Sequence, residues 1–205
     1  LWQRSPLPRS GGAIILGNHR CPVDPLFIFS ASTNRPGALA IRVMEFLTAR
    51  EYSDVGGPIG FICRTMRTIP VDRDGRDMES AREALRRLSL GHIVGIFPEG
   101  RINKGEGLLP AIPGVAWLAL KGGVPIFPAY IHGAPQADNM IQPFITPAHV
   151  RVTWGEPIDL SAYARQRMTP ELLQRVSGVL MNKLAETGGL RPPLRISDPP
   201  VEQAS

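Results

Sequence analysis

Short, wholly apolar runs alternate with amphipathic stretches along this chain, and this alternation constrains the fold more than any other feature. The runs Gly12–Leu16 and His92–Phe97 are apolar throughout, as expected for strands that are buried on both faces of a sheet. The stretch Asp77–Leu90 instead repeats its apolar residues at helical spacing, with Asp77 as a candidate N-cap and Gly91 as a candidate C-cap. This alternation predicts the α/β class: a single layered domain with a mixed sheet of about seven strands flanked by helices.

Weaker patterns place the remaining elements. Further strands are predicted at residues 38–43, 68–71, 124–131 and 149–154, and further helices from residue 24 and at residues 44–52, 114–121 and 169–184. Two prolines in the strand Val124–Ile131 predict that it is irregular or at an edge. We expect residues 1–187 to form one domain, and residues 188–205, which are rich in Pro and Gly, to be a disordered tail.

The charge of the chain favours an anionic partner. Lysine and arginine outnumber the acids 23 to 18, and all but three of these basic residues are arginines. Arginine prefers phosphate and carboxylate, which predicts a phosphorylated substrate, a nucleotide or an acidic lipid surface. The two cysteines, Cys21 and Cys63, support neither a disulfide framework nor a Cys-rich metal site, which fits a reducing compartment. No uncharged apolar run has the length of a membrane-spanning helix, and an upstream membrane helix stays open because the sequence starts at Leu1.

The stretch Gly17–Asp24 (GNHRCPVD) joins the first predicted strand to the first predicted helix. His19 lies in this connection, and Asp24 follows at the start of the helix. A neutral imidazole can take a proton from a hydroxyl when a carboxylate holds its other nitrogen in the right tautomer. His19 and Asp24 are therefore a candidate base and its orienting acid. In the competing interpretation, Asp24 only caps the helix and His19 bonds a backbone carbonyl.

Four stretches resemble, in order, the four signature blocks of the glycerolipid acyltransferases, the family of 1-acylglycerol-3-phosphate acyltransferase. The blocks are Asn18–Asp24 (NHRCPVD), Ile69–Arg73 (IPVDR, preceded by Gly60 and Phe61), Phe97–Gly100 (FPEG) and Val124–Pro128 (VPIFP). Together they span Gly17–Pro128, more than half of the chain. The resemblance identifies residues 1–187 as an acyltransferase domain.

The resemblance implies that a fatty acyl group moves from acyl-CoA or acyl carrier protein to a hydroxyl of a lysophospholipid. The implied acceptor is 1-acylglycerol-3-phosphate, which gives phosphatidic acid. His19 is the implied general base and Asp24 its partner, an arrangement typically worth about 10² to 10⁴ in rate. Because the acceptor attacks an activated thioester directly, we expect no enzyme nucleophile, no metal and no cofactor besides the thioester co-substrate. An acyl-enzyme on Cys21 is the alternative, which its two-residue offset from His19 disfavours.

The same resemblance assigns substrate-binding residues. Glu99 and Gly100 are expected to contact the acceptor's glycerol portion, and Arg73 to offer a bidentate fork to its phosphate. The alternatives are that Glu99 is a turn residue and that Arg73 is a surface arginine paired with a neighbouring aspartate. Arg101 is a further candidate for the phosphate, although the family generally has a small residue between the glycine and the arginine. The fourth block either lines an acyl-chain channel or packs in the core.

Other function classes have weaker support. A non-catalytic phospholipid-binding module on the same fold, or an acyltransferase for a different hydroxylated lipid, are the alternatives. A hydrolase lacks a Gly-x-Ser-x-Gly elbow, and no P-loop or nucleic-acid-binding motif is present. The expected partners are a lysophospholipid, an acyl thioester donor and an anionic membrane surface, without nucleic acid. The expected location is the cytoplasm, peripheral on the cytoplasmic face of the membrane. Acceptor head group, acyl-chain length, donor and oligomeric state depend on surface features that motif spacing does not encode.

Overall fold

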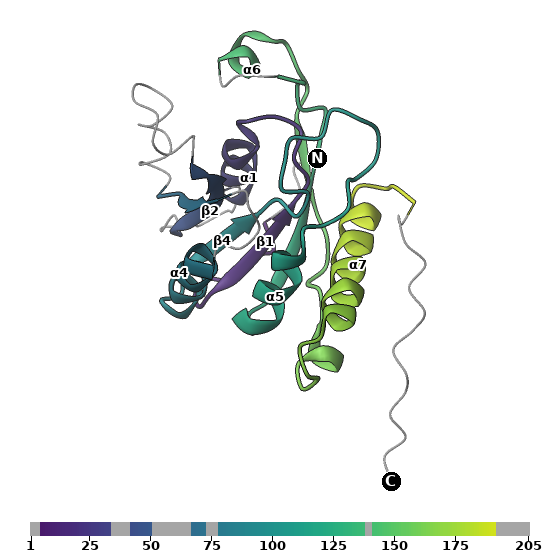
Figure 1. Ribbon diagram of the computed structural model, residues 1–205. Helices are drawn as coiled ribbons and strands as arrows, with labels where there is room; N and C mark the ends of the chain where they lie inside the picture. Colours follow the sequence, from purple (N-terminus) through teal and green to yellow (C-terminus); the bar gives the residue numbers. More distant parts are fainter. Residues whose placement is uncertain (1–4, 34–41, 51–66, 73–77, 138–140, 192–205) are drawn as a thin grey trace.

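The fold is given by a computed structural model, which describes residues 5–33, 42–50, 67–72, 78–137 and 141–191 of the 205 (Figure 1). In chain order the elements are β1 (Ala13–Gly17), α1 (Asp24–Ser32), β2 (Met44–Ala49), β3 (Ile69–Val71), α4 (Met78–Ser89), β4 (Ile93–Ile96), α5 (Pro113–Gly122), β5 (Ile126–His132), α6 (Gln142–Ile145), β6 (Arg151–Trp154), the 3₁₀ turn η1 (Ser161–Tyr163) and α7 (Pro170–Thr187).

The strands form one six-stranded sheet in the order β3-β2-β4-β1-β5-β6. The first five strands in this order are parallel, and β6 pairs with β5 in the antiparallel sense. The predicted α/β class and mixed sheet are confirmed, with six strands in the described ranges where about seven were expected. Parallel strands end at the same edge, so the segments that follow β1, β4 and β5 meet there, as in other α/β sites.

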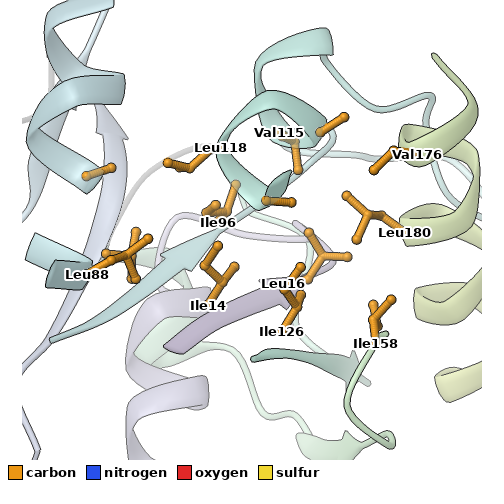
Figure 2. Packing of buried hydrophobic residues seen from close by; sticks show 14 of the residues in the cluster. Ile14, Leu16, Leu88, Ile96, Val115, Leu118, Ile126, Ile158, Val176 and Leu180 are labelled. Atoms are coloured by element: carbon orange, nitrogen blue, oxygen red, sulfur yellow. The ribbon is translucent and has the colours of Figure 1, made fainter. Parts of the chain in front are cut away.

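Helices cover both faces of the sheet. Helices α4, α5 and α7 pack on one face, where Figure 2 shows Ile14 and Leu16 of β1 directed toward the side chains of α5 and α7. The alternate residues Ala13 and Ile15 belong to the second cluster, on the face that α1 covers. Burial on both faces explains why β1 and β4 read as continuous apolar runs.

The prediction of a helix over Met44–Tyr52 is wrong, because Met44–Ala49 forms strand β2. Met, Glu, Leu and Ala favour helices in isolation, but pairing with β4 and β3 on either side overrides that preference. Phe46 is fully buried against β4. Of the strand predicted at residues 38–43, residues 38–41 lie outside the described ranges, and residues 42 and 43 precede β2.

Strand β5 is interior, although its prolines predicted an irregular or edge strand. The carbonyl of Pro128 accepts a hydrogen bond from Gly155 N at 2.9 Å, so Pro128 faces the β6 side. Regular β5–β6 pairing ends at Ala129 and Trp154. The missing N–H of Pro128 therefore removes no bond from the β1–β5 ladder, and on the β6 side it removes only the return bond to Gly155, beyond the end of the regular pairing, which is how an interior strand tolerates this residue.

The last helix follows its sequence signals. Thr169 Oγ1 accepts a hydrogen bond from Leu172 N at 3.2 Å, and Pro170 is the first helical residue of α7. Most of the predicted tail, residues 192–205, lies outside the described residues. Across the ranges that the structure describes, no helix combines the length and the apolar character needed to cross a bilayer.

Candidate active site

The connection between β1 and α1 places His19 beside Asp24. His19 Nδ1 lies 2.8 Å from Asp24 Oδ2, and the histidine side chain keeps 19% of its surface exposed while the carboxylate has none. No described residue hydrogen-bonds His19 Nε2. The ring therefore has one nitrogen fixed by a buried acid and the other available to a substrate, the arrangement that a general base needs.

Backbone amides hold the Asp24 carboxylate in place. Its Oδ2 accepts hydrogen bonds from Arg20 N at 2.5 Å and from Cys21 N at 2.8 Å. Asp24 is the first residue of α1, where the helix dipole also favours a negative charge. The N-cap of α1 is Val23, without a side-chain cap. The structure thus brings His19 and Asp24 into contact, as expected, and Asp24 does not cap α1 with its side chain; the role of His19 as a base stays a prediction.

A stack of three rings fixes the plane of the imidazole. His19 stacks on Phe97 with centroids 4.3 Å apart and an interplanar angle of 17°, and Phe97 stacks on Phe46 at 5.8 Å and 16°. Gly95 makes room for this stack, because a Cβ there would lie 2.2 Å from the Phe46 ring. The imidazole is therefore constrained both by its hydrogen bond and by packing.

Asn18 anchors the same connection to strand β5. Its side chain has no exposed surface, accepts a hydrogen bond from Ile131 N at 2.6 Å and donates one to Ile131 O at 3.1 Å. This pair of bonds fixes the end of β1 one residue before His19. Motif and spacing predicted no role for Asn18; an amide directly before the histidine, at the end of a buried strand, was the available signal.

Glu99 links the His19 segment to the loop after β4. The residue is 4% exposed. Its Oε1 accepts a hydrogen bond from His19 N at 2.9 Å, and its Oε2 accepts bonds from Asn103 Nδ2 at 2.8 Å and Leu109 N at 2.9 Å. Asn103 N in turn donates to His19 O at 2.7 Å. Both carboxylate oxygens of Glu99 thus accept hydrogen bonds from the protein. Oε1 accepts from the backbone of the candidate base, and Oε2 accepts from the loop after β4.

The family assignment follows from sequence comparison. A family profile described as Acyltransferase matches residues 3–132, more than half of the chain. The chain belongs to the acyltransferase family. A 1-acyl-sn-glycerol-3-phosphate acyltransferase of Bacillus subtilis (strain 168) is 29% identical over 191 residues, covering 90% of this chain and 88% of the relative. The protein of the same description from Salmonella typhimurium is 31% identical over 183 residues, covering 86% of this chain and 68% of the relative.

A solved structure shares the fold of this acyltransferase. The crystal structure of the 1-acyl-sn-glycerophosphate (LPA) acyltransferase PlsC from Thermotoga maritima superposes with a TM-score of 0.62 at 22% identity. The match covers 88% of this chain and 68% of the other. At this identity the likeness supports the α/β fold alone.

Of the other predicted substrate-binding residues, the structure describes Gly100 and Arg101. Gly100 follows Glu99 in a left-handed turn (φ 67°), where a Cβ would lie 2.8 Å from the Ile112 side chain, so glycine is required there. Arg101 is exposed at the same edge of the sheet. Arg73 lies outside the described residues. The preceding Asp72 pairs with Arg50, with nitrogen–oxygen distances of 2.7 and 3.2 Å.

The thiol of Cys21 is poorly suited to covalent catalysis. Cys21 has no exposed surface, and its Sγ donates a hydrogen bond to Asp24 Oδ1 at 3.3 Å. Burial, followed by the charge of Asp24, raises the pKa of the thiol to about 12. Because the thiolate is the nucleophile, this thiol stays unreactive near neutral pH.

Within the described ranges, no three His, Cys, Asp or Glu side chains group as metal ligands.

Proposed function

We propose that this acyltransferase moves a fatty acyl group from acyl-CoA or acyl carrier protein to the free hydroxyl of 1-acylglycerol-3-phosphate, giving phosphatidic acid. The observation that carries the proposal is the His19–Asp24 pair, held at 2.8 Å with Nε2 available at the carboxyl edge of the sheet. The names of the Bacillus and Salmonella relatives support this choice of acceptor.

The chemistry needs one proton shuttle. His19 Nε2 takes the hydroxyl proton as the acceptor oxygen attacks the thioester carbonyl. The buried charge of Asp24 stabilises the imidazolium that forms. When the tetrahedral intermediate collapses, the carbon–sulfur bond breaks, and the leaving thiolate takes the proton back from His19. Such a base supplies about 10² to 10⁴ in rate, and the step needs neither an acyl-enzyme nor a metal.

Arginines are proposed to bind the acceptor's phosphate. Arg101 is exposed beside Gly100, and in sequence Arg73 directly follows Asp72, which lies after the end of β3. A planar guanidinium offers two parallel donors to a phosphate. Glu99 and Gly100 are proposed to shape the acceptor's glycerol subsite, with Glu99 acting also through the backbone of His19. We propose that the enzyme acts at an anionic membrane surface, on the cytoplasmic face, where thioester donors are present.

A thiol-release assay tests the proposal. Wild type and His19→Ala are compared on a panel of lysophospholipids and other hydroxylated lipids, with acyl-CoA and acyl carrier protein as donors. We expect His19→Ala to lower turnover at least about a hundredfold, with an unchanged thermal melting curve as the control for folding. Equal turnover of the two proteins would refute the mechanism. Binding to lipid vesicles without thiol release from any donor would identify a non-catalytic lipid-binding module instead, and preference for another acceptor would replace the substrate.

A further inference from the structure

The most exposed large apolar side chains of the described chain gather at α6. Ile141, Phe144 and Ile145 are 69%, 64% and 74% exposed, whereas the next most exposed, Leu90, is 58% exposed. In Figure 1, α6 stands away from the body of the domain, on the connection between β5 and β6. We call Ile141, Phe144 and Ile145 the α6 tip. Adjacent apolar side chains exposed on a projection mark an interaction site.

The α6 tip lies at the same edge of the sheet as the candidate active site. Strand β5 ends there at His132, and the segment that leaves it toward α6 contacts the loop after β4, where Gln136 Nε2 donates to Lys104 O at 3.1 Å. The same loop bonds the catalytic segment through Asn103 N and His19 O at 2.7 Å. The tip and the base are thus connected through one loop.

Cationic and hydrogen-bonding groups surround the base of α6. A cavity of about 560 Å³ is lined by His132, Gly133, Ala148, His149, Val150 and Arg151. Arg151 is exposed, as are Arg101 and Lys104 on the neighbouring loop. Between His132 and Arg151 the sequence contains a single acid, Asp138. This edge is therefore suited to a negatively charged surface.

We propose that the α6 tip inserts into the interfacial layer of an anionic phospholipid bilayer, and that the cavity at its base receives a lipid phosphate. The lengths are compatible: His149 follows Ile145 by four residues, at most about 14 Å of extended chain, and the head-group layer of one leaflet is roughly 5–8 Å thick. A tip in the acyl boundary thus leaves the cavity near the head groups. The inference rests on the proposed function in one respect: the acceptor is a membrane lipid.

A bilayer fits the α6 tip better than a second copy of the chain. A stable protein–protein interface buries about 800 Å² per partner over some 20–30 residues. Three side chains, two on a four-residue helix and one just before it, are too few for such a surface. Interfacial membrane binding, in contrast, combines a small inserted apolar group with nearby cations.

Vesicle sedimentation tests the α6 tip directly. The 205-residue chain and its Phe144→Ser/Ile145→Ser variant are mixed with vesicles of phosphatidylglycerol and phosphatidylethanolamine, or of phosphatidylcholine alone. We expect the double variant to bind the anionic vesicles at least about thirtyfold more weakly, since each buried apolar side chain contributes a large factor. Phe144→Trp should keep binding, because tryptophan suits the interface. Leu90→Ser, an exposed apolar residue just before β4 at the opposite edge, is the matched control and should bind like wild type.

The charge component is tested with Arg151→Gln, compared with Arg82→Gln on the exposed surface of α4. We expect Arg151→Gln to weaken binding to anionic vesicles by about fivefold and to flatten its salt dependence. Arg82→Gln should change neither. Equal binding of Arg151→Gln and wild type at low salt would refute the lipid-phosphate part of the proposal.

Turnover separates this inference from the proposed function. With a water-soluble, short-chain lysophosphatidate, the Phe144→Ser/Ile145→Ser variant should turn over like wild type, and with acceptor in vesicles it should be slower. Normal turnover together with vesicle binding that the double variant leaves unchanged would overturn the docking proposal alone. Binding that depends on the α6 tip without turnover on any acceptor would overturn the proposed function alone. A dimer that dissociates in the double variant, without vesicle binding by wild type, would assign the tip to a second copy and also overturn the docking proposal.

Discussion

Replacing Glu99 tests whether this residue holds the His19 segment in place or only contacts the substrate. In Glu99→Gln the side chain keeps its shape but has one oxygen instead of two. Glu99 Oε1 faces the His19 N–H, and Oε2 faces the donors of Asn103 and Leu109. Whichever way the amide is oriented, its NH₂ group points at a protein donor.

The magnitude follows from these contacts. Each buried donor left without its acceptor costs about 1–3 kcal/mol, so we expect Glu99→Gln to lower the free energy of unfolding by roughly 2–4 kcal/mol. Domains of this size lose about 2–4 °C of Tm per kcal/mol, which predicts a drop on the order of 5–15 °C. Glu99→Ala removes the acceptor on both sides and should lower the Tm further. Because His19 loses its backbone anchor, kcat should fall for every acceptor.

Thermal denaturation and steady-state kinetics measure the two effects together. Glu106→Gln is the control, since Glu106 is exposed on the same loop, and it should change neither Tm nor kcat. If Glu99 only bound the acceptor, Glu99→Gln would instead raise the KM for the acceptor and leave the Tm unchanged. That result would refute the structural role assigned to Glu99.

Three further predictions concern the site and the cavity beside it. Asp24→Asn should lower turnover about a thousandfold, because roughly 4 kcal/mol of attraction between Asp24 and the imidazolium of His19 is lost, while acceptor KM changes little; near-normal kcat would contradict this. Cys21→Ala should keep turnover within about tenfold, and mass spectrometry of quenched wild type should show no acyl-enzyme. Burial and the charge of Arg151 lower the pKa of His132, so its contribution to stability should be complete above the unfolded pKa of about 6.5 and decrease as the pH falls below it. Arg151→Gln should raise the pKa of His132 and reduce this loss, as NMR titration and melting at several pH values can show.

The sequence predicted the local part of the site and missed the long-range part. His19 and Asp24 are five residues apart in one connection, so the pattern of a strand followed by a helix was enough to predict that they meet. The bonds of Asn18 to Ile131 and of His19 to Glu99 join residues 113 and 80 positions apart. Periodicity carries no information about such pairs, since sheet order decides which segments become neighbours.

The same limit explains the wrong helix at β2. The segment Met44–Ala49 has good helix formers, and its strand conformation depends on β4 lying beside it. In the sequence, Gly95 is only one residue of an apolar run. In the structure a glycine is needed there because the Phe46 ring lies against the β4 backbone. Both features follow from packing between segments that are distant in sequence, so local preference does not predict them.

The arrangement of these contacts explains how a loop residue can be precise enough for catalysis. His19 lies outside the strands, yet its ring and backbone are held from β1, from α1, and from the segment after β4, through Asn18, Asp24, Phe97 and Glu99. Each of these four residues restrains a different feature. Asn18 fixes the end of the strand, Asp24 the tautomer, Phe97 the plane of the ring, and Glu99 the path of the backbone. If His19 is the base, as proposed, a ring fixed in this way need not reorganise when the acceptor binds. In the proposed mechanism the substrate must then be brought to His19, and this is the task that we propose for the α6 tip, which is connected to the same loop.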